Sequence, residues 1–232
     1  MHMRIRSIIA PMLGLALTGT VANAQLLLSG NTTGSFVDLS EAHTTVVNAP
    51  DGSSASFMTG VPASGSTQSK ILFSNATFTD VGSGDAIQAG LFSITNGITF
   101  IGTGAPTAQF NLGLTLTSPI SQEIALSTIT FHIDNTVNTG DNLIPDQFSV
   151  TFDQPAPLMV DNMLVQFHVN FEPTEFQVAE NATVQRGDVT VTFSPVPEPS
   201  TYALWGSALL LGFVAYRRTR GGRSLPSFSA AA

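Results

Sequence analysis

The chain has 232 residues and no cysteine. This absence excludes a disulfide framework, a thiolate metal site and a thiol nucleophile. It also excludes a lipid anchor attached through an N-terminal cysteine of an exported protein. The fold must therefore be stabilised by the burial of apolar side chains, and the central part of the chain is long enough for one domain with such a core.

Basic residues are scarce between the two ends of the chain. The segment from Gln25 to Pro195 contains only Lys70 and Arg186 against fifteen acidic residues, a net charge of 2 − 15 = −13. Nucleic acids and other anionic polymers bind to clusters of Lys and Arg, so we expect no nucleic-acid partner. Such a surface attracts divalent cations, although acidity alone also keeps an exported protein soluble.

The same segment has no tryptophan and no tyrosine. Trp205, Tyr202 and Tyr216 all lie near the C-terminus, so Phe is the only aromatic residue type between Gln25 and Pro195. Platforms that stack on sugars generally use amphipathic rings with a polar group, whereas these Phe residues fall mostly on inward positions of the expected strands. This composition argues against a glycan site built on aromatic side chains.

The N-terminus has the three parts of a secretory signal peptide. Arg4 and Arg6 precede an apolar stretch from Ile8 to Leu17, and a small-x-small pattern follows. We expect the general export machinery to recognise residues 1–24 and signal peptidase to remove them. The cleavage site is defined by Ala22, Ala24 and Gln25.

Alternation of apolar and polar residues predicts strands in residues 25–193. The pattern is cleanest where Phe110, Leu112, Leu114 and Leu116 alternate with polar residues or glycine, and it recurs in 148–152, 163–171 and 189–193. Turn clusters rich in Gly, Asp and Asn separate the strands, and no helical stripe is present. We therefore expect an all-β extracellular domain, an antiparallel β-sandwich resembling a jelly roll, with about ten strands.

One expected strand contains an irregularity. In residues 124–133 the apolar phase slips by one position between Ser127 and Thr128. An extra residue in one strand of a pair has this effect, so the sequence predicts a β-bulge or a bend there.

The segment from Phe92 to Phe100 has the sequence Phe-Ser-Ile-Thr-Asn-Gly-Ile-Thr-Phe, followed by Gly102-Thr103 and the strand Leu112 to Leu116. These residues resemble part of the β-rich "choice-of-anchor" domains of bacterial surface proteins. The resemblance implies a surface module and identifies no catalytic residue. Asn96-Gly97 between alternating runs also predicts a hairpin turn.

The C-terminus carries Pro197-Glu198-Pro199, an apolar run from Ala203 to Tyr216 and a basic end. We expect residues 194–200 to form a stiff Pro-rich linker, 201–216 a short transmembrane helix and 217–232 a cytoplasmic tail. As a helix, the apolar run would be roughly 21 Å long, against about 30 Å of bilayer hydrocarbon. The arginines expected to fix its orientation are Arg217, Arg218 and Arg220.

This order of elements closely resembles the PEP-CTERM sorting signal of Gram-negative bacteria. The resemblance implies that Pro197, Glu198 and Pro199 are recognised by a membrane-embedded exosortase. It further implies transient anchoring at the inner membrane, followed by delivery to the cell surface or to an extracellular matrix of exopolysaccharide, as in a biofilm. The extra segment from Ser224 to Ala232 departs from the pattern, in which chains usually stop after the arginines.

The densest polar segment follows the strand expected to end at Ile133. Its oxygen-bearing side chains could coordinate Ca²⁺ as a cofactor, but the spacing fails the EF-hand pattern because Thr136 stands at the third position and Gly140 falls one place late. A solvated loop with Asp and Asn in turn hydrogen bonds accounts for the same residues. The candidate ligands are Asp134, Asn138, Asp141 and Asp146.

Two histidines occupy similar positions in two expected strands. His132 and His168 both alternate with buried apolar residues, so both should point to solvent. If the two strands paired in register, the rings could bind Zn²⁺, with His43 completing the site. Surface histidines without a special role are the interpretation we favour.

The chain has no Gly-x-Ser-x-Gly elbow and no distinctive pair of carboxylates. We therefore expect a protein that is not an enzyme and has no catalytic residues. The leading hypothesis is an exported structural or adhesive protein of the surface or matrix. The alternatives are a calcium-dependent adhesin or glycan-binding module using Asp134 to Asp146 and, with less support, a polysaccharide hydrolase.

Overall fold

The computed structural model describes residues 26–137, 144–186, 189–196 and 199–221. These residues form fifteen β-strands and one α-helix. Every strand pair among them is antiparallel. The prediction of an all-β, antiparallel fold is therefore confirmed.

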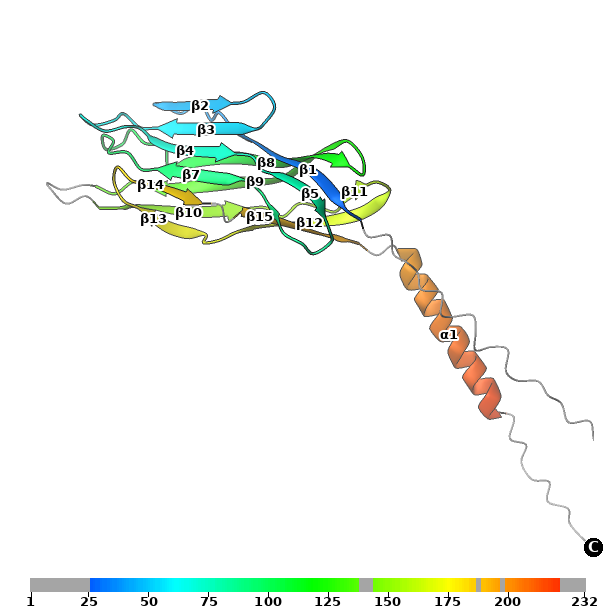
Figure 1. Cartoon of the computed structure of the whole chain (residues 1–232). Helices are drawn as coiled ribbons and strands as arrows, with labels where there is room; N and C mark the ends of the chain where they lie inside the picture. The colour runs from blue at the N-terminus through cyan, green and yellow to red at the C-terminus, as the bar shows by residue number, and fades with distance from the viewer. Residues whose placement is uncertain (1–25, 138–143, 187–188, 197–198, 222–232) are drawn as a thin grey trace, which may run out of the picture.

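One layer is a six-stranded sheet with the order β13-β10-β9-β8-β1-β5 (Figure 1). Three consecutive strands, β8, β9 and β10, are also neighbours in the sheet, so they form a meander and not the paired Greek keys of a jelly roll. The topology of this layer thus differs from the expected jelly roll. Its strands are β1 (Leu28–Phe36), β5 (Thr77–Val81), β8 (Thr107–Ser118), β9 (Gln122–Asp134), β10 (Asp146–Phe152) and β13 (Glu175–Val178).

The second layer consists of two sheets, with the orders β14-β7-β4-β3-β2 and β11-β12-β15-β6. The strands of the first are β2 (Thr44–Asn48), β3 (Ser54–Thr59), β4 (Ser69–Ser74), β7 (Leu91–Thr95) and β14 (Thr183–Arg186). Those of the second are β6 (Ile87–Gln88), β11 (Leu158–Val160), β12 (Met163–Phe171) and β15 (Val189–Pro195).

One interrupted ladder joins these two sheets. The register is the same in two stretches, where β7 pairs with β14 and where β6 pairs with β15. In both stretches the numbers of two paired residues add up to 278, as in Thr183 with Thr95 and Thr190 with Gln88. The bond from Ala89 N to Val189 O, 2.8 Å long, keeps this register between the two stretches. Gly90, at φ +120°, supplies the bend, because L residues rarely adopt this conformation. The second layer is therefore nearly continuous.

Phenylalanine rings from both layers meet in the core. Phe92 of β7 lies 5.0 Å from Phe110 of β8 and 5.4 Å from Phe131 of β9, measured between ring centroids. Phe171 of β12 contacts both Phe92 and Phe131. These contacts connect the six-stranded sheet with both sheets of the second layer, so the strands form a two-layer sandwich with an apolar interior.

The expected strands and the expected irregularity are found. Residues 110–116, 148–152, 163–171 and 189–193 lie in β8, β10, β12 and β15. Leu112 pairs with Ser127 and Gly113 with Ala125, which leaves Leu126 as the extra residue of a bulge in β9. The bulge predicted near Ser127 is therefore confirmed.

The hairpin predicted at Asn96-Gly97 is wrong. β7 ends at Thr95 and the next strand begins only at Thr107. Asn96 is completely buried, and its Nδ2 donates to the carbonyl oxygen of Val178 at 2.9 Å. This contact with a distant segment replaces the local turn that the dipeptide indicated. The expected number of strands is also too low, because very short strands such as β6 and β11 show no alternation.

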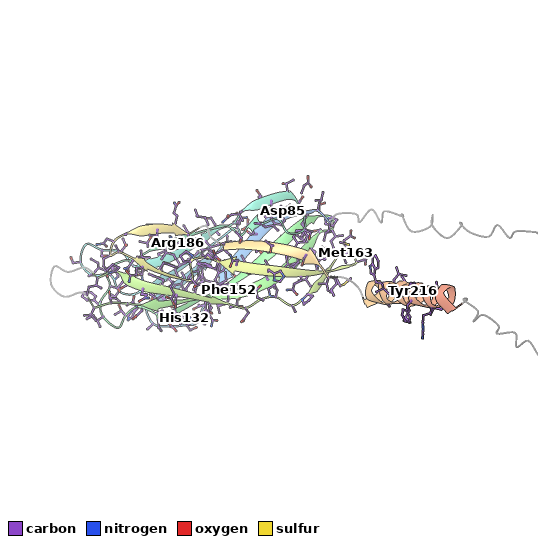
Figure 2. The ribbon with its side chains drawn as sticks, turned by 90° about the horizontal axis from the view of Figure 1, so that it is seen from below. Asp85, His132, Phe152, Met163, Arg186 and Tyr216 are labelled. Atoms are coloured by element: carbon purple, nitrogen blue, oxygen red, sulfur yellow. The ribbon has the colours of Figure 1, made fainter. Side chains whose placement is uncertain are left out.

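The helix α1 (Pro199–Gly221) lies beyond the end of the sandwich at which β1 begins and β15 finishes (Figure 1). Figure 2 shows it, marked by Tyr216, extending from the end at which Met163 lies. Pro199 is its first residue, where the missing N–H costs nothing. Among the described residues, no helix is long and apolar enough to cross a membrane. The expected transmembrane helix is therefore not found, because only Ala203 to Tyr216 is apolar before the arginines begin.

Candidate functional site

The sorting motif is only partly described. Pro199 begins α1, whereas Pro197 and Glu198 lie outside the described residues. The same holds for the expected signal cleavage site at Ala22, Ala24 and Gln25. The role of these residues stays a prediction from the sequence.

The helix α1 exposes apolar side chains on several sides. Leu204, Leu209 and Leu211 are 72%, 73% and 71% exposed. The described side chains of α1, from Ala203 to Arg217, are all exposed, and none of them packs against the sandwich. Near its end the guanidinium of Arg217 lies 5.8 Å from the ring centroid of Phe213. The side chains of Arg218 and Arg220 lie outside the described residues.

Hydrogen bonds of Asp146 and Thr136 connect the two ends of the segment between β9 and β10. The side chain of Asp146 is 3% exposed, and its Oδ1 accepts a hydrogen bond from the backbone N–H of Thr136 at 2.8 Å. The hydroxyl of Thr136 donates to the carbonyl oxygen of Ile144 at 2.7 Å. Burial raises the pKa of Asp146, and the hydrogen bonds from Thr136 oppose this shift. The described contacts of Asp146 therefore fit a residue that orders a loop.

The other candidate calcium ligands do not converge on Asp146 among the described residues. Asp134 is exposed on the outer face of β9, whereas Asp146 points into the sandwich. Asn138 and Asp141 lie outside the described residues. In the described ranges no group of three or more His, Cys, Asp or Glu residues could hold a metal ion. Calcium binding between Asp134 and Asp146 stays a prediction.

The strands that carry the two strand histidines do not pair. His132 of β9 lies opposite Ser149 of β10, while His168 of β12 lies opposite Thr192 of β15 in the other layer. Both side chains are exposed, as their alternation predicted, and Figure 2 shows His132 toward the end of the sandwich away from α1. His43, also exposed, precedes β2. The structure therefore does not support a zinc site shared by His132 and His168.

A groove of about 580 Å³ crosses the outer face of the six-stranded sheet. Its floor is low because Thr33, Gly113 and Ala125 are neighbours on β1, β8 and β9, and two of these have almost no side chain. The groove was not identified from the sequence, although the alternation in β8 places Gly113 on the outward face. The depression arises only when the register sets Gly113 beside Ala125.

Polar, mostly uncharged groups line this groove. Ser35, Asn111 and Thr115 border its floor, and the Oδ1 of Asn111 accepts a hydrogen bond from the hydroxyl of Thr128 at 3.1 Å. Two carboxylates, those of Asp51 and Glu123, also line the groove. Hydrogen bonds from Ser53 lower the pKa of Asp51. The carboxylate of Asp51 is therefore charged at neutral pH.

The arrangement can thus offer several hydroxyl and amide groups to a polar, uncharged ligand. No family model matches the chain, and the comparison with curated proteins finds no match.

Proposed function

We propose that this protein is an exported surface or matrix protein, sorted through its C-terminal segment and working without catalysis as an acidic β-sandwich. The observation that carries the proposal is the order of Pro197-Glu198-Pro199, an apolar run and a cluster of arginines, combined with a signal-like N-terminus. The expected partners are signal peptidase and the export machinery, an exosortase, the inner membrane during sorting and exopolysaccharide afterwards.

The position of α1 outside the sandwich supports separate roles for the two parts, sorting for the C-terminal segment and the extracellular role for the sandwich. The buried residues of the core, among them Phe92, Phe110 and Phe131, lie outside α1, and no described side chain of α1 belongs to this core. Loss of the tail should therefore leave the domain folded. The exposed leucines of α1 are unfavourable in water by about 25 cal/mol per Å² of apolar surface. Transient contact with lipid or with a membrane-embedded enzyme removes this cost.

The charge of the domain supports a place among extracellular polymers. With a net charge of −13 between Gln25 and Pro195, the surface repels anionic partners and resists non-specific association. These properties suit a protein that stays dispersed among neutral polymers.

The substitution Glu198→Ala in the native host tests the sorting proposal. We expect the variant to accumulate with the cells and to be depleted from the surface and extracellular fractions. The matched control is Asp153→Ala, which removes an exposed acid of the sandwich with the same change of charge. Normal delivery of the Glu198→Ala protein would overturn the proposal, and retention of both variants would point to a general export defect.

The groove on the six-stranded sheet supports a second candidate function, the binding of a neutral polysaccharide. Hydroxyl and amide groups of Thr33, Ser35, Asn111 and Thr115 can exchange hydrogen bonds with sugar hydroxyls. Because the domain has no Trp or Tyr for stacking, binding should be weak at each site. Many copies on one polymer would raise the overall avidity.

Native gels cast with soluble polysaccharides test this second function on the full chain in a mild detergent. We expect dextran or hydroxyethylcellulose to retard the protein, and anionic polygalacturonate to leave its mobility unchanged. Ala125→Tyr fills the groove and should abolish the retardation, whereas Thr130→Tyr, on the same face beyond the groove, should not. Equal retardation of the natural protein and the Ala125→Tyr variant would exclude the groove as the site.

A further inference from the structure

Of the six end strands of the three described sheets, β6 and β14 lie at the interrupted ladder inside the second layer, which leaves β5, β13, β11 and β2 at the outer edges of the sandwich. Edge strands expose unpaired backbone groups, and proteins usually protect them with charges, prolines, bulges or very short length. Three of the four edges have such protection. β5 contains Asp80 at φ +51°, β13 begins with Glu175 just after Pro173, and β11 has only three residues.

The edge strand β2 lacks all of these features. Its sequence, Thr44-Thr45-Val46-Val47-Asn48, contains no charge, no proline and no glycine. Val47 is 56% exposed, and β2 is the outermost strand of its layer in Figure 1. Uncharged β-branched residues favour strand pairing. The sequence of β2 therefore favours pairing with a strand of another chain, which the features of β5, β13 and β11 disfavour.

The hydrogen-bond pattern shows which backbone groups are free to pair. Gly60 N donates to His43 O at 3.1 Å, and Ala49 N donates to Ser54 O at 2.9 Å. In an antiparallel pair the bonded residues alternate, so the odd-numbered residues from 43 to 49 bond to β3. The N–H and C=O groups of the even-numbered residues therefore point outward. No protein group among the described residues bonds to them, although backbone polar groups are strongly selected for partners.

We propose that β2 pairs with β2 of a second copy of this chain, antiparallel and about a two-fold axis at Val46. In this register Thr44 lies opposite Asn48 of the other copy, and Val46 lies opposite its own counterpart. The outward groups then form three bonded pairs with two hydrogen bonds each, and the two five-stranded sheets become one continuous sheet. The pairing occurs whether or not the C-terminal segment is a sorting signal.

Charge favours a second copy as the occupant of this edge. The stretch from Ala42 to Pro50 contains no acidic residue and only His43 as a titratable group. Two copies can therefore pair along this stretch without facing like charges, whereas Glu41 and Asp51, which flank it, lie opposite each other at both ends of the proposed register. The net charge of −13 on each domain still opposes association over longer distances. Dimerisation should therefore strengthen as salt screens this repulsion.

Sedimentation velocity of the full chain, with α1 covered by a mild detergent, tests the proposal. We expect a dimer that increases with protein concentration and with salt. Val46→Pro removes only an outward N–H and Val47→Lys places a charge on the edge, so each should weaken dimerisation at least tenfold. The control Met159→Lys, on the exposed part of β11, should have no effect. A natural protein that stays monomeric, or a dimer that survives both β2 substitutions, would overturn the proposal.

Engineered cysteines test the register, because the natural chain has none. In the proposed dimer Thr45 lies opposite Val47 in a non-bonded pair, with about 4.5 Å between Cα atoms, which suits a disulfide. The double variant Thr45→Cys/Val47→Cys should therefore form a covalent dimer when diamide is added as oxidant. Thr45→Cys alone should not, because the two copies of residue 45 are diagonal neighbours about 7–8 Å apart. Efficient crosslinking of the single variant would contradict the antiparallel register.

Discussion

The carboxamide of Asn48 acts as a strand partner for Phe36. Its Oδ1 accepts a hydrogen bond from the backbone N–H of Phe36, and its Nδ2 donates to the carbonyl oxygen of Phe36, both at 2.9 Å. One side chain of β2 thus satisfies both backbone groups at the end of β1. Because β1 and β2 belong to different layers, this contact ties the two layers together at one edge of the sandwich.

The rest of this edge of β1 is covered in the same way. β5 pairs with β1 only as far as Asn31. Beyond it, Thr32 N donates to Ala76 O at 2.8 Å, and Gly34 N donates to Gly52 O at 3.0 Å. Single residues of two connecting segments, Ala76 before β5 and Gly52 between β2 and β3, therefore replace the missing strand, and this edge offers little for pairing with another chain. The contrast with the free edge of β2 makes β2 the better candidate for self-association.

Replacing Asn48 with Ala should destabilise the domain by about 1–3 kcal/mol, because two backbone groups of Phe36 lose their partner. Urea denaturation followed by circular dichroism would measure this change. Thr45→Ala, on an exposed side of the same strand, should change stability by no more than about 0.5 kcal/mol. Equal midpoints for both variants would show that water replaces the carboxamide without cost.

Gly34 is required because of the ring of Phe110. A Cβ atom at position 34 would overlap that ring, so Gly34→Ala should cost about 1–3 kcal/mol through overpacking. The double variant with Phe110→Leu should recover part of this loss, because the smaller side chain leaves room for the new methyl group. Strictly additive effects in the double-mutant cycle would contradict a direct clash.

Asp146 should make stability depend on pH. Burial raises the pKa of Asp146, so the folded state binds its proton more tightly than the unfolded state does. The free energy of unfolding should therefore decrease as the pH rises from the ordinary carboxyl pKa, about 4, through the raised value. Asp146→Asn keeps an acceptor for Thr136 but removes the titration. The variant should gain stability relative to the natural protein as the pH increases, measured by urea midpoints between about pH 3 and pH 7.

Asp153→Asn is the control for this pH dependence, since Asp153 is exposed. The urea midpoint of this variant is measured over the same pH range. If Asp146→Asn behaved in the same manner, the carboxyl of Asp146 would have no unusual affinity for its proton in the folded domain.

Local patterns in the sequence predicted the regular part of the fold. The alternation in β8 and β12 shows which side chains face the core, and the slip at Ser127 locates the bulge. These features depend on neighbours along the chain and in the adjacent strand. The sequence could not predict that Asn96 is buried, because its partner, the carbonyl of Val178, is far away in the chain.

The candidate sites were harder to predict for the same reason. The polar residue Asp146 looked like a metal ligand or a loop residue, whereas its buried position follows from the way β10 enters the sandwich. The groove depends on the register that places Gly113 beside Ala125. The free backbone groups of β2 depend on the order of strands in the sheet, which alternation does not reveal.

Mass spectrometry of the intact protein recovered from the surface and extracellular fractions of its native host tests the central claim most directly. If the two ends of the chain are addresses that are removed, the recovered protein should begin at Gln25 and should lack the helical residues from Ala203 onward. Recovery from these fractions of a chain that still begins at Met1 and extends to Ala232 would contradict the account.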